Sequence, residues 1–125
     1  MKANAAARTS APAAYLNVPT TLERLGGDEE LFGEIAQILV QTAPDQLASI
    51  RAALVANDLK RAREEAHSLK GAVAAFEAPE VFNSVADVER LAKADDAVGA
   101  KAALADASAL VETLLAELTP HIPSH

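Results

Sequence analysis

The feature that most constrains the fold is a series of apolar residues that follow one another in alternating steps of three and four. The series is Leu59, Ala62, Ala66, Leu69, Val73 and Phe76. This spacing places all of its members on one stripe of an α-helix. A helix with such a stripe buries it against other helices, so we expect residues 59–76 to form one helix of a bundle.

Breaks on the N-terminal side divide the preceding chain into three expected helices. A short helical turn at 20–25 runs into Gly26-Gly27, and Asp28 is suited to cap the next helix. We expect that helix to end near Ala43, because Pro44 fits the first turn of a further helix. The first of these two helices has the expected core face Leu31, Ile35, Ile38, Leu39 and Thr42, and the second has Leu47, Ile50 and Leu54.

Two more helices are expected after residue 76. Pro79 is tolerated in a first turn and begins one of them, and Asp95-Asp96 marks the corner before the last, which Pro120 stops. The expected core residues of the first are Val81, Val85, Val88 and Ala92, and those of the last are Val98, Leu104, Ala107, Val111, Leu114, Leu115 and Leu118.

These segments predict an all-α protein, an antiparallel up-down four-helix bundle with one or two short accessory helices, since helices joined by short loops bury their stripes by packing antiparallel. We expect a flexible N-terminal tail at 1–18, the bundle at 19–119 and a C-terminal tail at 120–125. The two tail histidines, His121 and His125, are expected to be incidental.

Composition excludes several classes of function. The net charge of −7 is opposite to what binding to a nucleic-acid backbone or an anionic membrane needs. The chain has no cysteine, which removes disulfides and thiolate chemistry. It has no apolar run of the roughly 20 residues that span a bilayer. We expect a cytoplasmic monomer.

His67 is the candidate functional residue. On the helical wheel it lies well over 90° from the centre of the apolar stripe, so it faces solvent. Lys70 and Gly71, three and four residues later, lie on the same side. Gly71 costs roughly 1 kcal/mol relative to Ala inside a helix, which suggests that a partner's backbone approaches there. Ala74, one turn further, also keeps this surface low.

An exposed imidazole, whose unperturbed pKa is about 6.5, is a competent nucleophile for a phosphoryl group. Lys70, with Arg63 beside it, would compensate the added negative charge. Glu64, one turn before His67, is the candidate to orient the other ring nitrogen.

The stretch Ala66-His67-Ser68-Leu69-Lys70-Gly71, followed by Phe76 and Ala78, resembles the histidine-containing phosphotransfer (HPt) domain. The likeness covers about residues 20–118, including the Gly26-Gly27-Asp28 entry and the Val88-Glu89 segment. It implies a four-helix bundle in which His67 takes a phosphoryl group from a receiver-domain aspartate and passes it to another receiver.

The resemblance also implies that Lys70 assists near the phosphate and that Gly71 gives the receiver clearance. No cofactor is expected in this chain, and any Mg²⁺ would be on the receiver. The chain departs from the family at Glu77, where glycine is usual, so Glu77 would affect partner choice if it lay near the docking surface. Arg63, Glu64, Gly71, Ala74 and Glu77 are the expected partner-contacting residues.

The same residues allow other interpretations. Glu64 and His67 have the spacing of one half of a di-iron site, but the second half is missing, and we expect no metal. A sensor-kinase dimerisation helix usually has an acidic residue where Ser68 stands, and the chain has no nucleotide-binding loop. The main alternative is an interaction bundle of the same fold that binds a signalling partner without phosphotransfer.

Overall fold

A computed structural model describes residues 15–123, which hold five α-helices, a short 3-10 helix and no strand. The α-helices are α2 (Val18–Arg24), α3 (Glu29–Val55), α4 (Leu59–Ala74), α5 (Pro79–Lys93) and α6 (Ala97–Leu118), followed by the 3-10 helix η1 (Thr119–His121). The prediction of an all-helical protein is confirmed for the described residues. Residues 1–14 of the expected N-terminal tail and residues 124–125 lie outside them.

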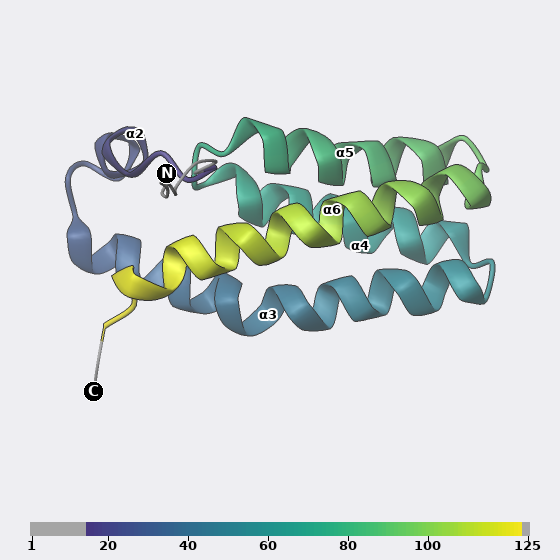
Figure 1. The fold of residues 1–125 in the computed structure, drawn as a ribbon, viewed down its shortest axis with the longest axis horizontal. Helices are drawn as coiled ribbons and strands as arrows, with labels where there is room; N and C mark the ends of the chain where they lie inside the picture. Colours follow the sequence, from purple (N-terminus) through teal and green to yellow (C-terminus); the bar gives the residue numbers. More distant parts are fainter. Residues whose placement is uncertain (1–14, 124–125) are drawn as a thin grey trace, which may run out of the picture.

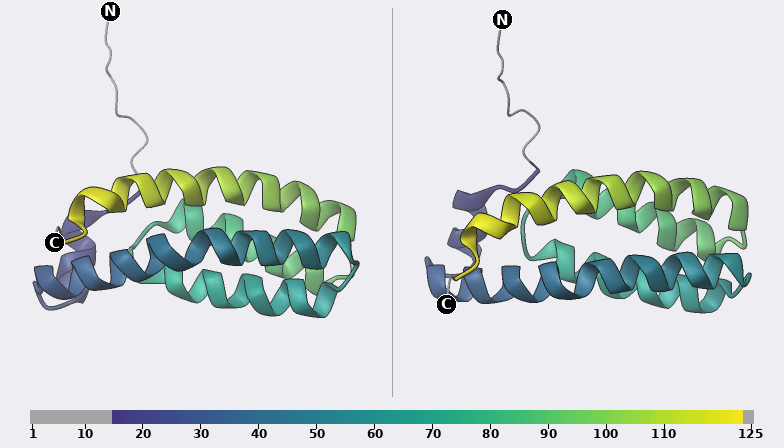
Figure 2. Two further views of the ribbon diagram at one scale, coloured as in Figure 1. Left: turned by 90° about the horizontal axis from the view of Figure 1, so that it is seen from below. Right: turned by 60° about the horizontal axis from the view of Figure 1, so that its bottom comes forward.

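The long helices α3, α4, α5 and α6 lie side by side, with α2 across one end (Figure 1). Two further views show the same arrangement (Figure 2). In the contacts between elements, α3 packs on α4, α4 on α5, α5 on α6, and α6 back on α3. The face between α4 and α5 is therefore opposite the face between α3 and α6. None of the helices among residues 15–123 is long and apolar enough to cross a membrane.

Two of the turns between long helices have the same local structure. Asn57 and Asp95 adopt left-handed backbone conformations with φ of 57° and 65°, which end α3 and α5. The aspartate that follows each one caps the next helix: the Asp58 side chain accepts from the Arg61 amide, and Asp96 from the Gly99 amide. Asn and Asp tolerate this conformation better than other residues with a side chain, so the dipeptides explain the sharp corners.

The predicted break at Pro44 is wrong, because α3 runs without interruption from Glu29 to Val55 with Pro44 inside it. A proline within a helix removes one backbone hydrogen bond and crowds the preceding turn. Here Leu39 and Ala43 before it and Leu47 and Ile50 after it are all buried. Packing of this continuous stripe offsets the local cost.

Some expected core residues are exposed. Ile38 is 58% exposed and Val98 is 81% exposed, and Leu31 also faces solvent. The buried stripe of the first half of α3 is Phe32, Ala36, Leu39 and Ala43, which is rotated from the predicted face. The prediction was wrong because it took the larger apolar side chains as the core residues. The small residues Ala36 and Ala43 lie on the face that is buried.

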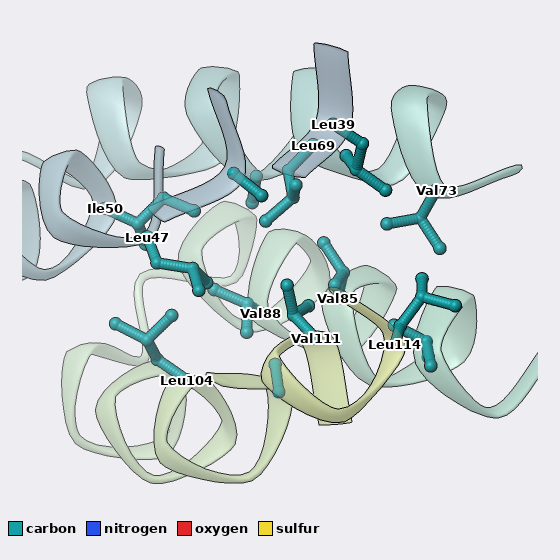
Figure 3. Close-up of a cluster of buried hydrophobic side chains, with 14 of the residues drawn as sticks. Leu39, Leu47, Ile50, Leu69, Val73, Val85, Val88, Leu104, Val111 and Leu114 are labelled. Atoms are coloured by element: carbon teal, nitrogen blue, oxygen red, sulfur yellow. The ribbon is translucent and has the colours of Figure 1, made fainter. Parts of the chain in front are cut away.

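The core lies between the four long helices (Figure 3). The predicted stripe of α4 is buried from Ala62 to Phe76, with only Leu59 partly exposed. The predicted residues of α5 are all buried, and so are most of those of α6, including Val111 and Leu114. This packing directs the opposite side of α4 to solvent.

Both ends of the described chain pack on the bundle. The backbone amides of Tyr15 and Leu16 donate to the Glu117 carboxylate of α6 at 2.9–3.1 Å. At the other end the His121 ring stacks on Phe32, with ring centroids 5.0 Å apart. The expectation that His121 is incidental is therefore corrected, because its ring packs on the core residue Phe32.

Candidate functional site

His67 lies in the middle of α4, on the side away from the core, and its side chain is 69% exposed. The neighbouring residues on the core side, Ala66 and Leu69, are fully buried. The burial of these two neighbours fixes the direction in which the imidazole points, independently of any contact that the ring makes. The predicted exposure of His67 is confirmed.

The imidazole is held by a residue of the next helix. His67 Nδ1 lies 2.8 Å from Glu89 Oε2, which comes from α5. An ionised carboxylate can only accept a hydrogen bond, so Nδ1 is the nitrogen that carries the proton. Nε2 is then the nitrogen with the free lone pair. Glu89, rather than the expected Glu64, orients the ring.

Lys70 reaches the same carboxylate. Its Nζ lies 2.6 Å from Glu89 Oε1 and 5.8 Å from the centre of the Phe82 ring. The Lys70 side chain is only 24% exposed, so it lies against α5 instead of projecting freely. One carboxylate thus joins the imidazole and the ammonium group.

The two partners keep Glu89 ionised. Its partial burial acts to raise the pKa of the Glu89 carboxyl, but the hydrogen bonds and charges of Lys70 and His67 outweigh this and hold that pKa below its ordinary value. The carboxylate is therefore charged at neutral pH, as its role as hydrogen-bond acceptor requires.

A hollow lies beside the imidazole, between α4 and α5. It is lined by Arg63, Glu64, His67, Glu89 and Lys93. Arg63 and Glu64 are thus brought to the site as expected, although no hydrogen bond joins Glu64 to the ring within residues 15–123. Lys93 was missed, like Glu89, because a single helical pattern cannot show which residues of a neighbouring helix lie opposite.

The surface beyond His67 is low and open. No other part of the described chain comes within 4 Å of the position that a Cβ on Gly71 would occupy. Intramolecular packing therefore does not require the glycine there. Ala74 is half-buried at the end of α4, and its carbonyl accepts a hydrogen bond of 3.0 Å from Arg24.

Glu77 lies apart from this surface. It follows the end of α4, ten residues after His67, which is roughly 15 Å at the helical rise. It has a φ of 50°, a conformation that favours glycine, and its carboxylate pairs with Arg24. Glycine, which is usual in the family at this position, adopts this backbone conformation freely, so the shape of the turn explains the family's preference.

The site has no metal-binding character in the described residues: no group of three or more His, Cys, Asp or Glu side chains is placed to hold an ion there. His67 and Glu89 are each engaged with the other, and Lys70 adds a positive charge beside them. The arrangement is suited to bind and carry an anionic group at Nε2.

Comparison with protein families agrees with this geometry. The family model of the Hpt domain matches residues 34–120, so the chain belongs to the Hpt domain family. These are the histidine phosphotransfer domains of phosphorelays, which interact with receiver domains. Searches of curated proteins and of solved structures give no match.

Proposed function

We propose that His67 accepts a phosphoryl group from a receiver-domain aspartate and passes it to another receiver, as an intermediate of a cytoplasmic phosphorelay. The observation that carries the proposal is the bond between His67 Nδ1 and Glu89, which leaves Nε2 of an exposed ring as the nucleophile. We take the four long helices as the antiparallel up-down bundle that presents this ring, in a chain acting as a monomer.

The transfer begins with attack of the Nε2 lone pair on phosphorus. The N–P bond forms as the bond from phosphorus to the aspartate oxygen breaks, and the carboxylate leaves with the electron pair. The Nδ1 proton stays in place, so the ring becomes a cation, and the Glu89 carboxylate stabilises that charge. Any Mg²⁺ that assists would be held by the receiver.

Lys70 compensates the charge of the bound phosphoryl group in this proposal. It lies one turn from His67 and is tied to Glu89 at 2.6 Å. A short movement of a flexible lysine side chain would let its ammonium group share the phosphoryl oxygens. Glu89 thus contacts both His67, which accepts the phosphoryl group, and Lys70, which compensates its negative charge.

The receiver would dock over the face between α4 and α5. Gly71 and Ala74 leave room for its backbone, and Arg63 and Lys93 line the hollow next to His67. A phosphorylated aspartate is strongly anionic, so these cations favour its approach. Glu64 lines the same hollow, whereas Glu77 is expected to act through the turn that follows α4.

The test is transfer of labelled phosphate from a phosphorylated receiver to the purified protein. Label that is acid-labile and base-stable is expected on the wild type and on His121→Gln, which changes the other described histidine. It is expected to be absent from His67→Gln, whose circular dichroism should match the wild type because the ring is exposed. Label on His67→Gln would refute the assignment, and no label from receivers that bind would favour the interaction module.

A further inference from the structure

The contact between His67 and Glu89 has a consequence for the release of the phosphoryl group. When an N–P bond breaks, the electron pair returns to Nε2. If Nδ1 carries a proton, the ring leaves as a neutral imidazole. If that proton has been lost, the ring must leave as an imidazolate anion, which is a far poorer leaving group.

We propose that Glu89 keeps the proton on Nδ1 of phosphorylated His67 and thereby makes this residue a good phosphoryl donor. The inference rests on the proposed function and concerns onward transfer. It follows from the 2.8 Å contact between Nδ1 and Oε2 and from the fixed position of the carboxylate, which α5 and the bond to Lys70 hold in place.

One proton stays on Nδ1 throughout the cycle of phosphoryl acceptance and donation. During acceptance, the ring changes from a neutral imidazole to a phosphorylated cation. During donation, a receiver aspartate oxygen forms a bond to phosphorus, the N–P bond breaks, and the ring becomes neutral again. Glu89 accepts a hydrogen bond from the same proton at both stages and exchanges none, so it is a positioning residue.

Other charges around the ring modulate this effect. Arg63 and Glu64 face the hollow from α4, and Lys93 and Glu89 face it from α5. Lys70 binds the second oxygen of Glu89 and draws part of its charge away from the ring. Glu89 nevertheless makes the only side-chain hydrogen bond to His67 among the described residues, so its removal should have the largest effect.

The test uses phosphoramidate, a small donor that needs no docked protein, to phosphorylate the wild type, Glu89→Gln and Glu112→Gln. Glutamine keeps the size and the acceptor oxygen of glutamate but removes its charge. Glu112→Gln makes the same change at an exposed position of α6, outside the hollow, and is the matched control. Nitrogen NMR of the ring and the rate of phosphoryl transfer to a receiver are then measured from pH 5 to 9.

In the wild type, Nδ1 is expected to stay protonated to a pH about one unit higher than in Glu89→Gln, and at pH 8 the variant should donate about tenfold more slowly. Glu112→Gln should stay close to the wild type. Equal pH profiles in all three proteins would overturn the inference while leaving the phosphorylation of His67 standing. If phosphoramidate labels His67→Gln as strongly as the wild type, the proposed function itself fails.

Discussion

The two opposite faces of the bundle differ in charge and in how that charge is used. Helices α4 and α5 together have six basic and five acidic residues, whereas α3 and α6 have two basic and seven acidic. Three of the basic residues of the first pair lie at His67: Arg63 and Lys93 line its hollow, and Lys70 pairs with Glu89. Most of the positive charge of these four helices therefore lies on α4 and α5.

The opposite face has a different character. Its hollow between α3 and α6 is lined by Arg51, Leu54, Val55, Lys101, Leu104 and Ala105. Arg51 and Lys101 are the single basic residues of their helices, and neither has an ion pair within residues 15–123. This face offers positive charge without an exposed nucleophile. Positive charge is therefore present on both faces, and the imidazole held by Glu89 is what distinguishes the face between α4 and α5.

Reversing the charge on each face in turn is expected to show the largest difference between them in the rate of phosphoryl transfer. Arg63→Glu with Lys93→Glu should slow transfer from a phosphorylated receiver about tenfold or more at low salt, because both side chains line the hollow at His67. Arg51→Glu with Lys101→Glu makes the same change of charge on the far face and should have little effect. Stopped-flow transfer rates over a series of salt concentrations measure both, and equal losses would remove the distinction.

Replacing Lys70 sharpens the role of the ion pair. Lys70→Ala should slow transfer about three- to tenfold and leave His67 able to accept phosphate, because the lysine supplies charge and the ring supplies the new bond. Lys101→Ala is the control on the opposite face. Single-turnover transfer rates measure the change, and an unchanged rate would deny Lys70 its role.

Glu77 tests whether the turn after α4 belongs to the docking face. Glu77→Gly should stabilise the protein by up to about 1 kcal/mol, because glycine adopts the left-handed conformation freely and the lost pair with Arg24 is exposed. Thermal unfolding measures the stability. Receiver transfer should stay close to the wild-type rate, and a large change in that rate would place Glu77 at the interface.

The smallest expected effect is on acid stability. Because the pKa of Glu89 is lowered in the folded protein, its pairing stabilises the fold above pH of about 4.5 and this contribution is lost as the pH falls through the lowered value. The wild type should therefore lose slightly more stability than Glu89→Gln on going from pH 6 to pH 3. Denaturant unfolding at these two pH values measures the difference, and a larger loss in the variant would contradict the sign.

The sequence predicted α4, α5, α6 and the exposed histidine because all of them depend on local spacing, whereas Pro44 led it to divide α3 in two. The stripe of α4 sets the direction of His67 by itself, and the Asn57-Asp58 and Asp95-Asp96 corners follow from the conformations those residues tolerate. Glu89 and Lys93 were not assigned to the site, since their positions depend on the register between α4 and α5. The Val88-Glu89 segment was noted for its resemblance to the family, but Glu89 was given no role in the site.

The most direct test of the central claim is to find which atom receives the phosphoryl group. Protein labelled with ¹⁵N in its histidines, once phosphorylated, reveals the bonded nitrogen through its coupling to phosphorus. The bond between Nδ1 and Glu89 predicts phosphorus on Nε2 of His67. Phosphorus on Nδ1, or on any other residue, would contradict the account.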